Sequence, residues 1–200
     1  MPSTTHTRLL SEGLAAFLAK GYHGTGIQHI VSASGVPKGS FYNHFGSKEE
    51  MAVESIERFA AGIRQRLDES FTAEDATVLE IVDEMLGALI EQQEAEVDRQ
   101  GCLLGNLTAE VATTSDALRA ALELGFVSWR EPFERLFERG QAEGSVRDDL
   151  PPRELADFLL DVWEGALLRM RIEAGSTRAL EERRRQLVDH FLPASDPTRA

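Results

Sequence analysis

Residues 34–51, SGVPKGSFYNHFGSKEEM, concentrate hydrogen-bond donors of several chemical kinds in one short stretch. The donors are ammonium, hydroxyl, phenol, carboxamide and imidazole groups, carried by Lys38, Ser40, Tyr42, Asn43, His44 and Lys48. Ammonium and hydroxyl groups bind phosphate oxygens, and carboxamides pair with the edges of bases. The stretch therefore indicates a surface suited to a nucleic acid.

The distribution of charge supports this interpretation. The whole chain has a formal charge of −13, but residues 1–48 contain four basic side chains and only one acidic one. All three lysines of the chain, Lys20, Lys38 and Lys48, lie in this segment. Such asymmetry indicates an anion-binding head on an acidic body. Because an acidic surface repels a duplex, we expect residues 49–200 to face ligands and protein partners instead.

A second stretch with chemical potential is RQGCLLGNLTAEVA, residues 99–112. Cys102 is the only cysteine, which excludes an intrachain disulfide framework and any multi-cysteine zinc site. One interpretation makes Cys102 the nucleophile of an enzyme, with His190 or His44 as the base. No Asp-His-Ser, P-loop, dinucleotide or HExxH pattern accompanies it. We therefore expect no catalytic residue, no metal site and no cofactor.

The elements that must position these residues are helices. Apolar residues recur with helical periodicity along the 200-residue chain, and no convincing strand pattern occurs, which predicts an all-α fold of about nine helices. Thr25 with Gln28, and Ser47 with Glu50, have the spacing of a capping box at a helix start. The predicted helices cover a segment ending at Gly21, then 26–33, a short helix from Pro37, a long helix after Ser47, and about 75–95, 103–113, 116–142, 153–174 and 177–192.

The second and third of these helices have the composition of a helix-turn-helix, with Gly35 in the turn. This motif holds its second helix away from the body, so that it can enter a major groove. Ile27, Ile30 and Val36 are expected to pack inward. Phe41 and Phe45 are predicted to belong to the core rather than to the DNA contact, because of their apolar spacing.

The segment GTGIQHIVSASGVPKGSFYNHFGSKEE resembles the DNA-binding segment of the TetR family of bacterial transcriptional regulators. That family has a Gly-Val-x-x-Gly-x-x-Tyr-x-His-Phe run followed by a lysine at the next helix start. The resemblance implies a three-helix DNA-binding domain over residues 1–48 and a larger ligand-sensing and dimerisation domain over residues 49–200. Gly26 stands where the family often has serine or threonine, so one hydroxyl contact to phosphate is missing.

Roles follow for individual side chains. Lys38 and the amides near Gly39 are expected to bind phosphate at a helix start. Asn43 and Gln28 are candidate base readers, although the amide of Gln28 could instead complete the capping box at Thr25. The resemblance implies that Tyr42 and His44 contact the DNA backbone or thymine methyl groups. It also implies that Lys48 meets a phosphate at the start of the next helix. The predicted DNA-binding residues are Thr25, Gln28, Lys38, Gly39, Ser40, Tyr42, Asn43, His44 and Lys48.

The Gly-Cys-x-x-Gly-Asn-x-x-x-Glu pattern resembles a branch of the family that responds to electrophiles, oxidants or small unsaturated acids, including the N-ethylmaleimide-responsive and acrylate-responsive repressors. The resemblance implies that Cys102 is the sensor, and a helix N-terminus or Arg99 would favour its reactive thiolate. The alternative is a small buried apolar residue. The predicted ligand and sensor residues are Cys102, Asn106, Phe126, Trp129, Phe133 and Trp163. Aromatic residues at helical spacing are more often core, which is the alternative for the four aromatic members.

The last two helices carry a broad apolar stripe, and the resemblance implies that they pack against a second copy as a four-helix bundle. The run EERRR at 181–185 predicts a solvated face with a Glu181–Arg185 pair. No apolar run reaches the roughly 18 residues of a spanning helix, and MPSTTHTRLLSEG lacks the apolar core of a secretory signal. We therefore expect a cytoplasmic protein without a membrane partner.

Taken together, the sequence predicts a homodimeric, ligand-responsive transcriptional repressor. It would be released from a near-palindromic operator by a small-molecule effector, such as an electrophile or unsaturated small acid, or by modification of Cys102. A noncovalent effector with a structural Cys102 is the first alternative. A cysteine-dependent enzyme and a helical adaptor that does not bind DNA are the others.

Overall fold

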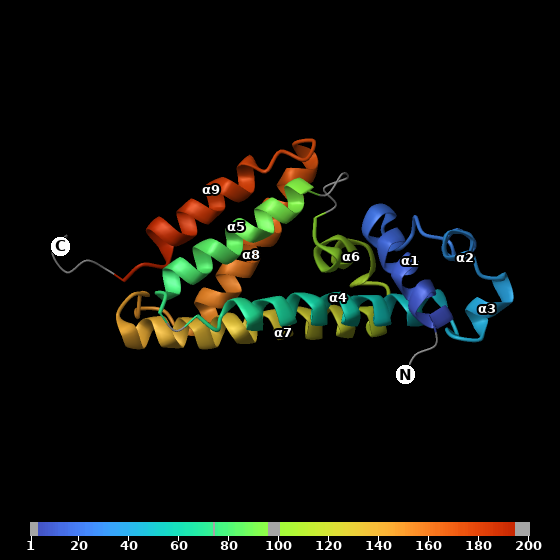
Figure 1. The fold of residues 1–200 in the computed structure, drawn as a ribbon, viewed down its shortest axis with the longest axis horizontal. Coiled ribbons are helices and arrows are strands. Elements are labelled where there is room, and N and C mark those ends of the chain that lie inside the picture. Colours follow the sequence, from blue (N-terminus) through green and yellow to red (C-terminus); the bar gives the residue numbers. More distant parts are fainter. Residues whose placement is uncertain (1–3, 74, 96–100, 195–200) are drawn as a thin grey trace. The chain divides into compact units, whose positions relative to one another are not determined.

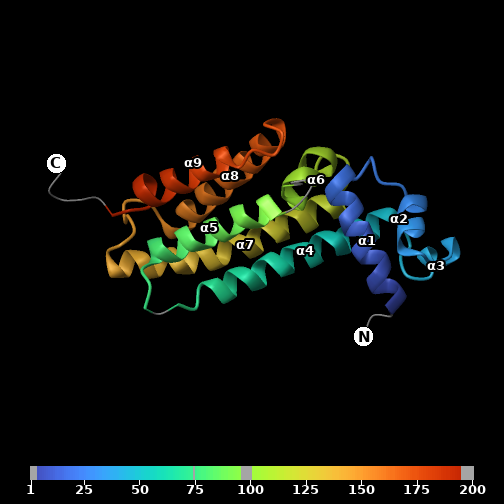
Figure 2. The same ribbon diagram turned by 45° about the horizontal axis from the view of Figure 1, so that its top comes forward.

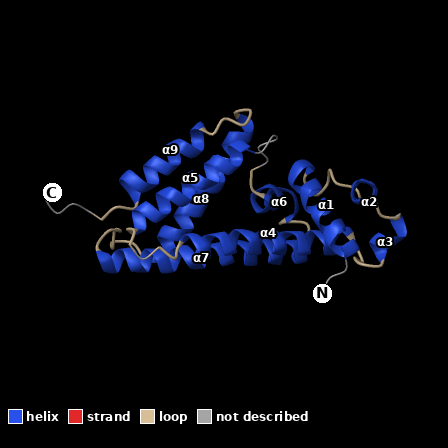
Figure 3. Ribbon diagram, in the orientation of Figure 1, coloured by secondary structure: helices blue, strands red, loops and turns tan. Residues whose placement is uncertain are grey.

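The computed structural model describes residues 4–73, 75–95 and 101–194. These residues form nine α-helices and one π-helix, η1, with no β-strand among them, so the all-α prediction is confirmed (Figures 1 and 3). None of these helices is long and apolar enough to cross a membrane. The elements are α1 (Thr4–Lys20), α2 (Ile27–Ser34), α3 (Lys38–Tyr42), α4 (Lys48–Ser70), α5 (Val78–Ala95), α6 (Leu103–Val111), α7 (Asp116–Glu143), α8 (Pro152–Ile172), α9 (Arg178–Gln186) and η1 (Leu187–Phe191).

The helix-turn-helix forms where it was predicted. Gly35 adopts the left-handed conformation, with φ +64°, and ends α2 with a bond from its N–H to the Ser32 carbonyl. Pro37 is extended and directly precedes α3, where its missing N–H leaves no donor unsatisfied. At the start of α4, the Ser47 hydroxyl accepts from the Glu50 N–H at 3.0 Å, which confirms the serine half of the predicted capping box. The Glu50 carboxylate accepts from the Gly46 N–H, at 2.7 Å, rather than from Ser47.

The chain divides into two compact units. The first contains Met1–Gly62 and Cys102–Phe126, and the second contains Ile63–Gly101 and Val127–Ala200. The first unit extends beyond the boundary expected at residue 48, because α6 packs on α1 and Gly125 of α7 closely approaches Leu104 and Ala60. The division by function into residues 1–48 and 49–200 therefore remains a prediction.

Buried aromatic side chains anchor α3 in the core of the first unit. Phe41 and Phe45 are fully buried, with ring centroids 5.6 Å apart, and the His6 ring stacks on Phe45 at 4.7 Å. This burial confirms their predicted core role. It also fixes which face of α3 points outward.

In the second unit, α9 lies beside both α8 and α5 (Figure 2). Arg184 of α9 donates to both carboxylate oxygens of Asp83 on α5, at 2.7 and 2.8 Å. Within the described structure, the ion pairs made by residues 181–185 are this one and Arg178–Glu182, rather than the expected Glu181–Arg185. The i, i+4 pairing expected on this face occurs as Arg178–Glu182, and Glu181 and Arg185 are exposed. The pair with Asp83 was not expected, because its partner lies on another helix.

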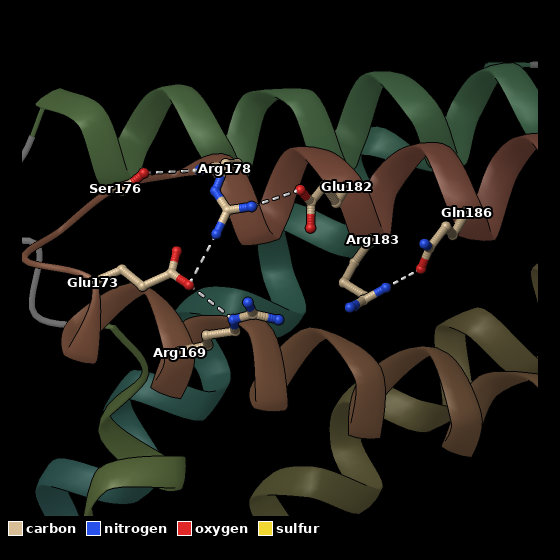
Figure 4. A network of polar contacts seen from close by, with 7 residues as sticks. All are labelled: Arg169, Glu173, Ser176, Arg178, Glu182, Arg183 and Gln186. Atoms are coloured by element: carbon tan, nitrogen blue, oxygen red, sulfur yellow. Dashed lines mark hydrogen bonds and ion pairs between the residues drawn. The ribbon is translucent and has the colours of Figure 1, made fainter.

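The turn between α8 and α9 is closed by a network of charged side chains (Figure 4). The Glu173 carboxylate accepts from Arg169 Nε at 2.9 Å and from Arg178 Nη2 at 3.1 Å, and Arg178 also pairs with Glu182. The hydrogen bond from Arg169 is the main reason that the pKa of Glu173 is lowered. These contacts join the last turn of α8 to the first turn of α9.

Most of the broad apolar stripe on the last two helices is buried within this chain, and only part of it is left for a second copy. Phe158 is the clear exception, with 42% of its surface exposed, and Val162 and Phe191 are half-buried. The buried members are Leu155, Leu159, Trp163, Ala166, Leu167, Met170, Leu180, Leu187 and Leu192. The stripe is therefore divided between an internal core and a narrower surface.

Candidate functional site

The predicted DNA-contacting residues of α3 lie on the surface of the first unit. Lys38 and Gly39 are exposed, Tyr42 is 58% exposed, and Asn43 follows as the exposed C-cap residue. Because Phe41 is buried, the helix cannot rotate these side chains inward without losing its anchor. Adjacent residues thus present an ammonium, a phenol and a carboxamide to solvent.

Ser40, His44 and Lys48 are the half-buried members of the predicted set. The His44 ring makes an edge contact with the His6 ring, at a centroid distance of 5.9 Å. His6 in turn contacts the Glu54 carboxylate through Nε2 at 3.1 Å. His44 is therefore packed against α1 on one side, which orients its ring.

The capping box predicted at Thr25 is not formed. Gly26 is the N-cap residue of α2 and makes no side-chain cap. Thr25 is only 1% exposed, and its hydroxyl lies 3.0 Å from the Ala16 carbonyl and 2.7 Å from the Gly21 carbonyl, as the donor. Its side chain is thus turned away from the DNA contact that was predicted for it. Gln28 is exposed, and its amide donates to the Ser32 hydroxyl at 3.3 Å rather than completing a cap at Thr25. Of its two predicted roles, base reading is the one that stays open.

Lys48 was expected to meet a phosphate, but its ammonium group is engaged within the chain. Nζ donates to the carbonyls of Tyr22 and Thr25, at 3.1 Å each, and lies 4.1 Å from the centroid of the Tyr22 ring. The Tyr22 carbonyl also accepts from the Thr25 N–H at 3.2 Å, so the lysine adds a bond from α4 to this turn. Lys48 thus joins the start of α4 to the α1–α2 turn, and its contact with a phosphate stays a prediction.

Two basic residues of this unit make contacts that the sequence did not predict. Arg8 Nη2 donates to the Ser34 carbonyl at 2.5 Å, which holds the α2–α3 turn against α1. Lys20 Nζ lies 3.2 Å from His29 Nε2 on the exposed surface. The count of basic residues included both Arg8 and Lys20, but their partners lie too far along the chain to be inferred from spacing.

The predicted sensor residue lies at the start of α6. Cys102 is the N-cap residue, in extended conformation and 7% exposed, and its carbonyl accepts from the Asn106 N–H at 3.0 Å. Asn106 is buried on the next turn. Arg99, which was expected to assist the thiolate, lies outside the described residues.

The aromatic residues predicted around a ligand are distributed over both units. Phe126 is half-buried, whereas Trp129, Phe133 and Trp163 are buried. The Phe133 ring packs edge-on against Phe71, with a centroid distance of 5.1 Å. For Phe133, the geometry supports a core role.

Comparison with known proteins identifies the family. Residues 9–54 match the family model described as bacterial regulatory proteins, tetR family. Residues 78–187 match the model described as the tetracyclin repressor-like C-terminal domain. The chain belongs to the tetR family. The members of this family are regulatory proteins rather than enzymes, which excludes the enzyme alternative.

Relatives of this TetR-family chain agree along most of its length. It is 40% identical to the HTH-type transcriptional repressor DhaR of Mycobacterium sp. strain GP1 over 186 residues, covering 92% of this chain and 86% of DhaR. The transcriptional regulator AcuR of Cereibacter sphaeroides is 33% identical over 171 residues, covering 86% and 78%.

Solved structures show the same fold. The reduced form of Escherichia coli NemR superposes with a TM-score of 0.87 at 28% identity, covering 95% of this chain and 97% of NemR. A TetR regulatory protein from Rhodobacter sphaeroides gives a TM-score of 0.87 at 32% identity, covering 94% and 100%. The predicted resemblance to the TetR family is therefore confirmed.

Proposed function

We propose that this chain is a homodimeric transcriptional repressor that binds a near-palindromic operator and is released by a small-molecule effector. The observation that carries the proposal is the outward face of α3, where Lys38, Tyr42 and Asn43 are exposed while Phe41 anchors the helix. Related chains described as HTH-type transcriptional repressors, such as DhaR and NemR, support the direction of regulation.

The chemistry of this face fits duplex DNA. The Lys38 ammonium and the Tyr42 phenol are suited to phosphate oxygens, which position the protein without reading sequence. The Asn43 carboxamide is suited to the N6 and N7 atoms of adenine in the major groove, and exposed Gln28 on α2 offers the same chemistry. Asn43 and Gln28 are thus the proposed readers of sequence.

The proposal is tested with the DNA immediately upstream of the chain's own gene. We expect the purified protein to bind this fragment more tightly than a scrambled fragment of equal length. Two copies of Lys38 would make log K fall with log salt at a slope of at least about 2, since each neutralised phosphate contributes about 0.9. Fluorescence anisotropy at several salt concentrations measures both quantities. Equal affinity for the two fragments would refute operator recognition.

The proposed dimer surface is the exposed apolar part of α8 with the end of the chain. Phe158 stacks on Phe191 of η1, with a centroid distance of 4.0 Å, and Ile172 is 86% exposed on the same side of α8. A surface groove runs between these elements; it is lined by Phe158, Val162, Arg183, Gln186, Leu187 and Phe191. An isologous pair formed here would place two copies of α3 on two half-sites of one operator.

The effector would act on the helices that follow the DNA-binding segment. Cys102 is the only cysteine of the chain, so a thiol-reactive effector has one site at which to bind covalently. Cys102 is the N-cap residue of α6, so the sensor route places the reacting sulfur at the start of that helix. Its burial slows attack by reagents and equally suits a packing role with a noncovalent effector.

Substitution of Cys102 separates these two routes. We expect N-ethylmaleimide, used as the probe, to add one adduct to the wild type and to release it from the upstream DNA, while Cys102→Ser stays bound. Intact mass and anisotropy are followed in the same sample. Release of both proteins to the same extent would make Cys102 structural and the effector noncovalent.

A further inference from the structure

Glu110, at the C-terminal end of α6, reaches the turn that leads into the helix-turn-helix. Its Oε2 accepts a hydrogen bond from the backbone N–H of His23 at 2.9 Å. The two residues are separated by 87 positions in the sequence. A carboxylate bonded to a backbone amide is a charge-assisted interaction, which is stronger than a bond between neutral groups. α6 therefore holds the α1–α2 turn directly.

The backbone of the turn is shaped to receive this carboxylate. Gly21 has φ +72°, a conformation that L side chains rarely adopt, and ends α1 with a bond from its N–H to the Phe17 carbonyl. A Cβ atom built on Gly21 would overlap the Glu110 carboxylate. Glycine at position 21 thus permits both the turn and the close approach of Glu110.

The same turn is fixed from two other elements of the first unit. Thr25 donates to carbonyls at Ala16 and Gly21, and Lys48 donates to Tyr22 and Thr25 from the start of α4. The next residue, Gly26, is the N-cap of α2 but has no side chain with which to cap it. Because α2 lacks a side-chain cap of its own, its start depends on how this turn is held.

We propose that Glu110 is a positioning residue for operator binding, which fixes the α1–α2 turn and, through it, the first helix of the helix-turn-helix. The inference rests on the proposed operator-binding function. Glu110 is the last residue of the Gly-Cys-x-x-Gly-Asn-x-x-x-Glu motif, and the proposal gives this motif position a role. The first half of the motif lies at the other end of α6. α6 connects the predicted sensor residue with the entrance to the DNA-binding helices.

Electrostatics and positioning predict opposite results for removal of this carboxylate. Loss of a negative charge from a DNA-binding head strengthens binding to any duplex. Loss of the bond to His23 weakens binding to the operator alone. The sign of the change in affinity therefore separates the two effects.

The test compares Glu110→Ala, Glu110→Asp and Glu110→Gln with Glu57→Ala, which removes an exposed carboxylate from α4 in the same unit. We expect Glu110→Ala and Glu110→Asp to bind the upstream DNA about tenfold more weakly, because neither reaches the His23 amide. Glu110→Gln keeps a carbonyl acceptor and is expected to stay within about threefold of wild type. Affinity for a scrambled fragment should not fall in any variant.

Melting temperatures are measured for all of these proteins, and binding is measured well below them. Equal or tighter operator binding by Glu110→Asp and Glu110→Ala, with only a lower melting temperature, would overturn the positioning role. So would an equal loss of affinity in Glu57→Ala. Failure of the proposed function is distinguishable, because wild type itself would then fail to prefer the upstream fragment.

Discussion

A chain in which Lys38 and Tyr42 are both replaced with alanine is expected to bind its operator about 10³-fold more weakly than wild type. In a dimer the substitutions remove four phosphate contacts, each contributing about 1 kcal/mol, and 1.4 kcal/mol corresponds to a factor of ten. The salt slope should fall by about 2, one unit for each lysine removed. Anisotropy titrations with the upstream fragment at several salt concentrations measure both changes.

Folding should be nearly unaffected, because Lys38 is exposed and Tyr42 is 58% exposed. The matched control is Arg58→Ala, which removes one cation from an exposed position of α4 in the same unit. We expect this control to keep operator affinity within about threefold of wild type, as a remote surface charge contributes little at physiological salt. Unchanged affinity of the double variant would instead favour the helical adaptor, which does not use this face.

The arrangement of α2 and α3 could be predicted because its causes are local. Gly35 closes the turn, Pro37 directly precedes α3 and Ser47 caps α4, and each acts on residues within a few positions of itself. The burial of Phe41 and Phe45 followed from apolar spacing in the same way. The exposed face of α3 was therefore predicted correctly before any tertiary contact was known.

The sequence could not assign partners where a side chain had a choice between a local and a distant one. Thr25 has the spacing of a cap, but the Ala16 and Gly21 carbonyls satisfy its hydroxyl instead. Lys48 has the type and position of a phosphate ligand, but it caps the α1–α2 turn. Sequence spacing cannot rank such alternatives, because the competing acceptors are placed by tertiary packing.

Contacts between residues far apart in the sequence could not be predicted. Arg184 pairs with Asp83 across 101 positions, and Glu110 reaches His23 across 87. No periodicity links residues so far apart, so the sequence shows only that these side chains are charged. For the same reason, the sequence motif drew attention to the position of Glu110 without indicating its role.

The second large effect is expected at the proposed dimer surface. Phe158→Arg should raise the dimer dissociation constant by at least about 10²-fold, because one substitution alters both halves of an isologous interface and places a charge in an apolar contact. The new cation would also lie beside Arg183 in the same groove. A monomer holds one half-site only, so operator affinity should fall by about 10²–10⁴-fold through loss of bivalent binding. Light scattering and anisotropy measure the two consequences separately.

Leu124→Arg provides the matched control, since Leu124 is 68% exposed on α7 in the first unit and outside the proposed surface. We expect this control to remain dimeric with operator affinity close to that of wild type. Phe158→Arg also removes the stack on Phe191, which contributes about 1 kcal/mol to monomer stability, so a modest fall in melting temperature is expected as well. Linking two Phe158→Arg chains with a flexible peptide should then restore much of the affinity, because the linker replaces the interface as the source of high local concentration. A Phe158→Arg chain that remains dimeric would show that the two copies meet on another surface.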